Sequence, residues 1–386
     1  MTFMGYRRPD GKAGVRNKIL ILPASACASD TARIIASQID GAVTFNNQNG
    51  CAQVSKDMEL TMDTMAGMAA NPNIFGTILV TLGCEGCQAD LVSAAVAART
   101  NKPLEAFIIQ ENGGTVRTVE KAVRAGRILA EEASKVQREA VSISELIVGT
   151  ECGGSDPTSG LAANILIGEL SDRLVALGAT SILSETTEFI GAEHILAARA
   201  KTPAIRDQIF HIVRRYEEAL RLVGEEIREG NPAPGNIAGG ITTLEEKSLG
   251  CIHKGGHSPV NAVYDYAKPV TEKGLVIMDT PGHDPSSVAG MVAGGAQIVV
   301  FSTGRGTPTG NPIAPVIKIT GNKLTYANMI DNIDWDSSPL IYGGKSLGEM
   351  GEDFLRELMA VACGKKTKAE ILGYTELAIA RLCNYV

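Results

Sequence analysis

The chain has 386 residues, of which 44% are hydrophobic and 20% are charged, so it can bury one large core or, as we expect here, two adjoining cores. Its net charge of -7 leaves no excess of Lys and Arg for a phosphate backbone, and only 4% of the residues are aromatic, too few for platforms that stack bases. These values argue against nucleic acid as a partner.

The first predicted strand, 18–22, follows a basic stretch and precedes small residues, an order that is also found in secretory signal peptides. Pro23 ends the apolar run well short of the roughly 7 to 15 residues that a signal peptide needs, and no other apolar run approaches the length of a membrane span. Eight cysteines are too sparse for a disulfide scaffold in a chain of this length. We therefore expect a cytoplasmic protein with reduced thiols and no membrane partner.

Short runs of β-branched and leucine residues alternate with longer helical patterns in the first half of the chain. The predicted strands cover residues 18–22, 42–45, 77–82, 106–109, 143–148 and 181–183. Helices are expected near Ser55 and from Thr115. This alternation predicts an α/β fold in which a parallel sheet is wound with helices, as in Rossmann-like domains.

The best candidate for a domain boundary is the stretch EGNPAPGNIAGGITT, which is rich in Pro, Gly and Asn. Beyond it, buried strands are predicted at 274–278 and 297–301, each followed by a polar loop that contains glycine. We therefore predict an N-terminal α/β domain over residues 1–232 and a second, smaller α/β domain over residues 233–386.

Four predicted strands are each followed by a cysteine, namely Cys27, Cys51, Cys84 and Cys152. In an open parallel sheet the loops after the carboxyl ends of the strands lie along one edge, where ligands bind. We therefore expect these cysteines to converge. Several of Cys51, Cys84 and Cys152 would then hold a metal; the alternative is that each is a small buried residue of the core.

The other four cysteines have different interpretations. Cys363 and Cys383, in late helical segments, are expected to be buried core residues, and Cys251 is left undecided. Cys84-x-x-Cys87 alone is ambiguous between a redox pair and half of a zinc site, but the sequence has no second such motif to complete a tetrahedral site. Because a helix is expected directly after Cys87, its side chain should face that helix and be dispensable.

Eight motifs extend over nearly the whole chain: GYRRPDGKAGVRN, NGC, LGCEGCQ, ENGGT, ECGGSDPTSGLAAN, GNIAGGITTLEEKSLGCIHKGG, MDTPG and FSTGRGTPTGNPIAPVIKIT. Together they resemble the large catalytic region of the altronate and galactarate dehydratase family. The resemblance implies an iron-dependent hydro-lyase that removes water from an altronate- or galactarate-like sugar acid and forms a 2-keto-3-deoxy acid.

Two alternatives accompany this interpretation. The β subunit of (2R)-sulfolactate sulfo-lyase is similar in fold and length but eliminates sulfite. That branch lacks the cysteines of the GC and LGCE motifs, whereas this chain keeps Cys51, Cys84 and Cys152, which favours a dehydratase. A subunit that binds a sugar acid without catalysis is the second alternative, and the intact Cys, Glu and Arg loops argue against it.

The family's iron fits two kinds of site. Three thiolates on an iron–sulfur cluster with one open iron would hold the substrate's hydroxyl and carboxylate. A mononuclear Fe2+ or Mn2+ site would more typically use histidines and carboxylates. With cysteines this prominent and only five histidines, the sequence favours the cluster.

The catalytic candidates are four residues. Glu185 and Glu188 lie in the loop after a predicted strand, and His194 has the near-neutral pKa that a proton shuttle needs. Lys247 would orient the substrate carboxylate or act as a base if it is desolvated, although most lysines lie on the surface.

The candidates for substrate binding lie in two loops. Arg305, in the loop that also contains Asn311, offers a bidentate guanidinium to a carboxylate; a bond to loop carbonyls is the alternative. Ser155 and Asp156 lie between a strand and a helix, where free N–H groups would bind an anion, with capping of that helix as the alternative.

The resemblance also bears on partners. Single-chain members of the family carry a small N-terminal antifreeze-like (SAF) domain, whereas this chain starts at GYRRPDG. We therefore expect the small domain to come from a second polypeptide, the chain alone to show little turnover, and the large chain to form a homo-oligomer.

Overall fold

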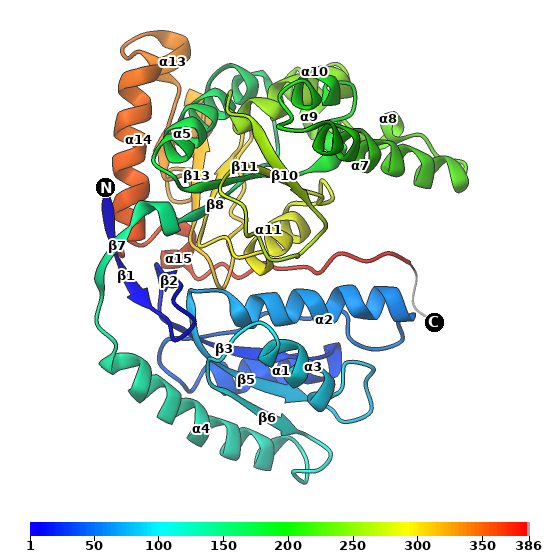
Figure 1. Ribbon diagram of the computed structural model, residues 1–386, viewed down its shortest axis with the longest axis vertical. Coiled ribbons are helices and arrows are strands. Elements are labelled where there is room, and N and C mark those ends of the chain that lie inside the picture. The colour runs from blue at the N-terminus through cyan, green and yellow to red at the C-terminus, as the bar shows by residue number, and fades with distance from the viewer. Residues whose placement is uncertain (384–386) are drawn as a thin grey trace.

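A sheet of four parallel strands forms the first half of the molecule, as the computed structural model of residues 1–383 shows (Figure 1). Its strands lie in the order β4-β3-β5-β6 and are β3 (Lys18–Pro23), β4 (Ala42–Val43), β5 (Ile74–Thr81) and β6 (Leu104–Ile108). The helices of this part are α1 (Ala26–Ala36), α2 (Ser55–Ala70), α3 (Ala89–Ala97) and α4 (Thr115–Lys135). We call it the small sheet.

A larger parallel sheet, the large sheet, has seven strands in the order β10-β11-β9-β8-β12-β13-β14. They are β8 (Ile147–Cys152), β9 (Thr180–Leu183), β10 (Val260–Tyr264), β11 (Gly274–Met278), β12 (Ile298–Ser302), β13 (Val316–Thr320) and β14 (Trp335–Asp336). Every residue of β11, β12 and β13 is buried. The apolar runs of β11 and β12 predict this for a sheet covered on both faces, whereas β13 also buries Lys318, whose ammonium donates to the carbonyls of Pro308 and Thr309. The chain leaves β8 toward β9 on one side and returns to β12 on the other, so the strand order reverses at β8.

Helices surround the large sheet, and a small antiparallel sheet joins the chain's first residues to the link between the two halves. This third sheet pairs β1 (Thr2–Arg7) with β2 (Ala13–Gly14) and β7 (Glu139–Ser142). The α-helices are α5 (Asn164–Ala176), α6 (Glu193–Ala197), α7 (Pro203–Leu222), α8 (Ile227–Gly230), α9 (Pro234–Gly239), α10 (Leu244–Cys251), α11 (Asp284–Ala293), α12 (Lys323–Asn328), α13 (Pro339–Tyr342), α14 (Leu347–Ala362) and α15 (Lys368–Leu372). Four short turns are 3-10 or π-helical: η1 (Ile143–Glu145), η2 (Ser159–Ala163), η3 (Thr186–Glu188) and η4 (Ile252–Gly255).

The predicted fold class is confirmed, because both large sheets are parallel and wound with helices. The boundary predicted between residues 232 and 233 needs correction, since β8 and β9 precede it and β10 to β14 follow it within one sheet. The Pro- and Gly-rich stretch that suggested it forms α8, α9 and their connections beside α7. The two parallel sheets instead separate between β6 and β8. No helix in residues 1–383 combines the length and apolar character that crossing a membrane requires.

The two halves pack through α2 and α11. A Cβ on Gly67 would lie 2.4 Å from the backbone oxygen of Ala293, so only glycine permits this approach of the two helices. Asn71, just after α2, donates hydrogen bonds to the carbonyls of Val292 and Ala296 at 2.8 and 2.9 Å. At this interface, a side chain from the part of the chain with the small sheet therefore hydrogen-bonds backbone carbonyls from the part with the large sheet.

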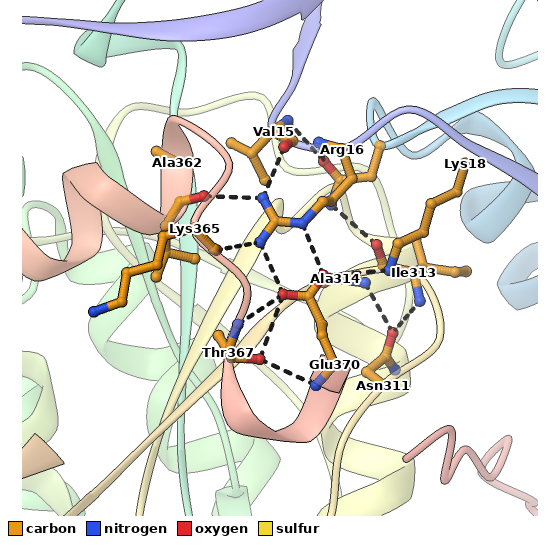
Figure 2. A network of polar contacts seen from close by, with 12 residues as sticks. Val15, Arg16, Lys18, Asn311, Ile313, Ala314, Ala362, Lys365, Thr367 and Glu370 are labelled. Carbon is orange, nitrogen blue, oxygen red and sulfur yellow. Dashed lines mark hydrogen bonds and ion pairs between the residues drawn. The ribbon is translucent and has the colours of Figure 1, made fainter. Parts of the chain in front are cut away.

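A second link joins the start of the chain to its end (Figure 2). Arg16 donates to both carboxylate oxygens of Glu370, at 2.7 and 2.8 Å, and also to the carbonyls of Val15, Val361 and Lys365. Burial alone would raise the pKa of Glu370, but the hydrogen bond and charge of Arg16 lower it below its ordinary value of 4.5.

Glu370→Gln should lower the free energy of unfolding by about 3–5 kcal/mol at neutral pH, because it leaves the Arg16 guanidinium buried without its counter-charge. Since the folded-state pKa of Glu370 lies below 4.5, the difference from wild type should be complete above that pH and vanish as pH falls through the lowered pKa. Urea unfolding at several pH values measures it. Glu120→Gln, which removes the exposed ion pair with Arg124, is the control and should change little.

Candidate active site

A cluster of buried ionisable side chains lies where the strand order of the large sheet reverses. Glu151 and Cys152 end β8, and Glu185 and Glu188 lie in and beside the turn η3 after β9. The carboxyl ends of parallel strands at such a reversal form the usual ligand-binding crevice of an α/β sheet. Glu185 has φ of 69°, a left-handed conformation that is strained for glutamate, and its N–H donates to the Thr280 hydroxyl at 2.8 Å.

Lys254, in η4, is the centre of this cluster and is fully buried. Its ammonium lies 2.7 Å from Glu185 Oε2 and 2.9 Å from the sulfurs of both Cys152 and Cys251. Burial alone would lower the pKa of Lys254, but these neighbours raise it well above its ordinary value, so the side chain stays charged. The two sulfurs lie 3.7 Å apart, and their contact together with burial raises the pKa of Cys152, which stays a thiol.

A second buried ion pair adjoins the first. The Lys247 ammonium lies 2.7 Å from Glu188 Oε1 and donates to Asn231 Oδ1 at 2.9 Å. Glu188 Oε2 lies 3.5 Å from the Cys152 sulfur, which connects the two pairs. Burial alone would lower the pKa of Lys247, but Glu188 raises it, so this lysine too is an ammonium at neutral pH.

Two cavities meet at Lys247. One, of about 280 Å³, is lined by Cys152, Ser155, Lys247 and His253, together with the π-helical turn η2. The other, of about 740 Å³, is lined by Lys247, Glu188 and His283, among others. The hydroxyl of Ser155 is buried and has no hydrogen-bond partner in the described part of the chain. Short π-helical stretches occur often at functional sites, and the cavities leave a small anionic molecule access to Lys247.

Three carboxylates also meet next to Lys254. Single oxygens of Glu151, Glu185 and Asp284 lie within 4.8 Å of one another. Burial, and the charges of Glu185 and Glu188, raise the pKa of Asp284 to about 7. Burial also raises the pKa values of Glu151 and Glu185. Mutual repulsion at such short range requires a proton or a cation between the carboxylates.

The predicted site residues divide into two groups. Cys152, Glu185, Glu188 and Lys247 come together, and Ser155 and Asp156 line the smaller cavity. The Asp156 carboxylate accepts hydrogen bonds from Thr158 and from the Ser159 N–H in its own loop, and from the Asn322 side chain. This corresponds to the alternative in which Asp156 caps the following helix.

Three other predicted residues lie elsewhere. His194 is exposed on α6 and lines neither cavity. Asn311 accepts hydrogen bonds from the N–H groups of Ile313 and Ala314, an internal turn visible in Figure 2. Arg305 is exposed, beside Gly154 and Gly235.

The four strand-end cysteines do not share one sheet edge, contrary to expectation. Cys27, Cys51 and Cys84 follow strands of the small sheet and are exposed, whereas Cys152 ends β8 of the large sheet and is buried. Within residues 1–383, no group of three ligand atoms within 4.8 Å contains Cys51 or Cys84. Their role as ligands therefore stays a prediction without geometric support.

The structure also shows where the remaining cysteines lie. Cys87 is buried in the core, as expected, and burial raises its pKa to about 12. Cys363 and Cys383 are exposed, so their prediction as core residues is wrong. Cys363 follows α14 directly, and Cys383 lies in the extended C-terminal segment; neither position faces a core.

Sequence reasoning missed four members of the cluster: Glu151, Cys251, Lys254 and Asp284. Two of them carried a usable signal, because Glu151 immediately precedes Cys152 at a strand end and Asp284 follows another strand in the loop DTPGHD. Lys254 carried none, since a lysine in a glycine-rich turn usually lies on the surface.

Comparison with known proteins assigns most of the chain to one family. Residues 5–134 match the second domain of D-galactarate dehydratase/altronate hydrolase, and residues 143–384 match the C-terminal domain of D-galactarate/altronate dehydratase. The (2R)-sulfolactate sulfo-lyase subunit beta of Chromohalobacter salexigens is 37% identical, over 99% of this chain and 97% of that one. Altronate dehydratase of Bacillus subtilis is 34% identical over 98% of this chain and 77% of its own length. Galactarate dehydratase (L-threo-forming) of Escherichia coli is 31% identical over 95% and 73%.

Lys254→Met should destabilise the protein by about 3–5 kcal/mol, because it leaves the Glu185 carboxylate buried without its cation. Adding Glu185→Gln removes the orphaned charge and should restore part of the loss, which a double-mutant cycle from urea unfolding measures. Lys345→Met, at an exposed ion pair, is the control. A Lys254→Met protein as stable as wild type would show that the two charges are not coupled.

Proposed function

Because the chain belongs to the D-galactarate/altronate dehydratase family, we propose that it is a hydro-lyase that removes water from an altronate- or galactarate-like sugar acid and releases a 2-keto-3-deoxy acid. The observation that carries this proposal is the Glu188–Lys247 ion pair, nearly buried and placed where two cavities meet. It offers a base and a cation to a substrate that is both a weak carbon acid and an anion.

Dehydration removes the proton on the carbon next to the carboxylate and expels hydroxide from the following carbon. In our proposal the Lys247 ammonium binds the substrate carboxylate and Glu188 removes the proton. When the substrate takes Lys247 as its partner, Glu188 loses its counter-ion and becomes a stronger base. The resulting enol takes a proton on the carbon that lost hydroxide and becomes the 2-keto acid.

The other side chains have supporting roles in this proposal. The unpartnered Ser155 hydroxyl binds a substrate hydroxyl in the smaller cavity. Glu185, whose Oε2 already accepts from Lys254 and from the Cys152 N–H, positions the cluster and does not act as the base. Arg305 forms no side-chain hydrogen bond or ion pair within residues 1–383, so it stays our candidate for a second carboxylate of an aldarate.

We also propose that the enzyme uses a divalent metal, with Fe2+ or Mn2+ as the candidates. When bound, the ion would act as a Lewis acid on the departing hydroxyl. The possible ligands that meet at this site are carboxylates and the sulfurs of Cys152 and Cys251. Such a set of ligands fits a mononuclear ion better than an iron–sulfur cluster held by Cys51, Cys84 and Cys152.

A second candidate is elimination of sulfite from (2R)-sulfolactate. The observation that favours it is the 37% identity to a sulfo-lyase subunit along nearly all of both chains. The same pair could serve this reaction, since it too begins with loss of a proton next to a carboxylate. That relative's name, subunit beta, also supports our proposal that a smaller second subunit completes this enzyme.

A panel of aldonates, aldarates and (2R)-sulfolactate, assayed for 2-keto acid and for sulfite, decides between the two reactions. We expect a 2-keto acid from a sugar acid and no sulfite. Sulfite from sulfolactate alone would assign the sulfo-lyase activity. No product from any acid in the presence of Fe2+ or Mn2+ and of the small neighbouring-gene product would favour a binding subunit.

Glu188→Gln should lower kcat by about 100-fold or more, because a carboxamide cannot take the proton, while KM changes little. Lys247→Met should raise KM and lower kcat together, since binding and orientation of the carboxylate are both lost. Glu193→Gln, in an α6 residue outside both cavities, is the matched control and should keep wild-type rates. Full activity in Glu188→Gln would remove this residue from the mechanism.

The small-subunit proposal is tested by adding the product of a small neighbouring gene to the purified chain. Turnover should rise strongly, because a cover over the sheet edge excludes water from the reacting groups. Equal rates with and without the added protein would contradict it.

A further inference from the structure

We propose that Glu151, Glu185 and Asp284 together hold one divalent cation. The three residues come from the end of β8, the turn after β9 and the first turn of α11. The inference rests on the proposed function only for what the ion does in catalysis; the binding site itself is argued from these side chains.

The first argument is an unpartnered oxygen. Glu151 is fully buried, and its Oε2 accepts hydrogen bonds from the hydroxyls of Ser184 and Ser287 at 3.0 and 2.6 Å. No donor group within residues 1–383 reaches its Oε1. Its carboxyl group faces those of Glu185 and Asp284, with single oxygens within 4.8 Å of one another, and without a cation it shares a hydrogen bond with Glu185. A buried carboxylate oxygen without a partner is costly, and a metal ion in this group would supply the missing contact.

The second argument is the balance of charge. Four carboxylates face one another in this part of the protein, namely Glu151, Glu185, Glu188 and Asp284. Two ammoniums, Lys247 and Lys254, oppose them. With all of them ionised, four negative and two positive charges leave an excess of two negative charges, which one divalent cation neutralises.

The third argument separates the ion from the thiols. Lys254 already lies within hydrogen-bonding distance of both Cys152 and Cys251, so an ammonium occupies the place that a thiolate-bound metal would take. Glu185 Oε2 is likewise engaged by Lys254 and by the Cys152 N–H. Among the described residues, the other contacts of this carboxylate are a long one of 3.8 Å from Oε1 to the Cys152 sulfur and the hydrogen bond shared with the Glu151 carboxyl. The free donors are therefore oxygens, the set that Mg2+, Mn2+ and Fe2+ accept.

Gly153 keeps the third ligand in place. A Cβ on this residue would lie 2.2 Å from Asp284 Oδ2 and 2.8 Å from Phe301 Cζ. The Asp284 carboxylate therefore occupies the space above Gly153, and a side chain there would push it away from Glu151 and Glu185. This contact gives a physical reason for glycine directly after Cys152.

The test is a titration of chelator-treated protein with Mn2+, followed by the electron paramagnetic resonance signal of free Mn2+ and by calorimetry. We expect one Mn2+ per chain. Glu151→Gln and Asp284→Asn should each weaken binding by at least tenfold, since loss of even an indirect contact typically costs about 10–100-fold. Gly153→Ala should weaken it as well. The Cys51→Ser/Cys84→Ser double variant, in the small sheet, is the matched control and should bind as wild type does.

The inference is overturned if wild type binds no Mn2+, if Asp284→Asn binds as tightly as wild type, or if the double cysteine variant loses the metal. Glu151 is fully buried, so its substitution could unfold the protein, and thermal unfolding of each variant shows which ones are folded. Asp284 is half-buried, so its substitution should disturb the core less. Turnover of a sugar acid by a protein that binds no Mn2+ would overturn this inference and leave the proposed reaction intact. One bound Mn2+ per chain without turnover of any acid in the panel, in the presence of the small neighbouring-gene product, would support this inference and overturn the proposed reaction.

Discussion

The burial of Lys254 and Glu185 as an ion pair, both fully enclosed and 2.7 Å apart, is the constraint on which the rest of the large sheet depends. Neither charge is tolerable there alone. Bringing them together requires the end of β8, the strained turn after β9 and the turn η4 to meet at one point, which the reversal of strand order at β8 makes possible. The same meeting point places Cys152, Cys251, Glu188 and Lys247 around the pair, so folding of the sheet assembles the candidate active site.

The small sheet contributes differently. The N-terminal motif GYRRPDGKAGVRN, one of the eight that carry the family resemblance, makes structural contacts. Arg8 donates to the carbonyls of Pro72 and Arg16, and Arg16 binds Glu370 near the end of the chain (Figure 2). The C-terminal segment returns across the interface, where Arg381 pairs with the buried Asp57 of α2. The two halves are thus held together by these buried ion pairs as well as by the contact between α2 and α11. Together these contacts fix the position of the small sheet relative to the large sheet.

Sequence periodicity predicted the fold class and most strands of both parallel sheets because long apolar runs bounded by glycine have few other solutions. It failed for the short or polar strands: β1, β2, β7, β10, β13 and β14 were missed, and the strand predicted at 143–148 begins only at Ile147, after the turn η1. The sheet that spans residue 232 was also divided. For the site, the strand-end rule found Cys152, Glu185 and Glu188, since it follows from sheet geometry alone. It also selected Cys51 and Cys84, because which strands share a sheet is not encoded locally. Lys254 depends on a partner 69 residues earlier, which no local pattern reveals.

The central claim is that catalysis is organised by carboxylates and lysines of the large sheet and not by the exposed cysteines of the small one. Anomalous diffraction at the manganese edge, from crystals grown with Mn2+, tests it most directly. The account predicts a single strong peak in contact with Glu151, Glu185 and Asp284. A peak beside Cys51 or Cys84, with none among the three carboxylates, would contradict it.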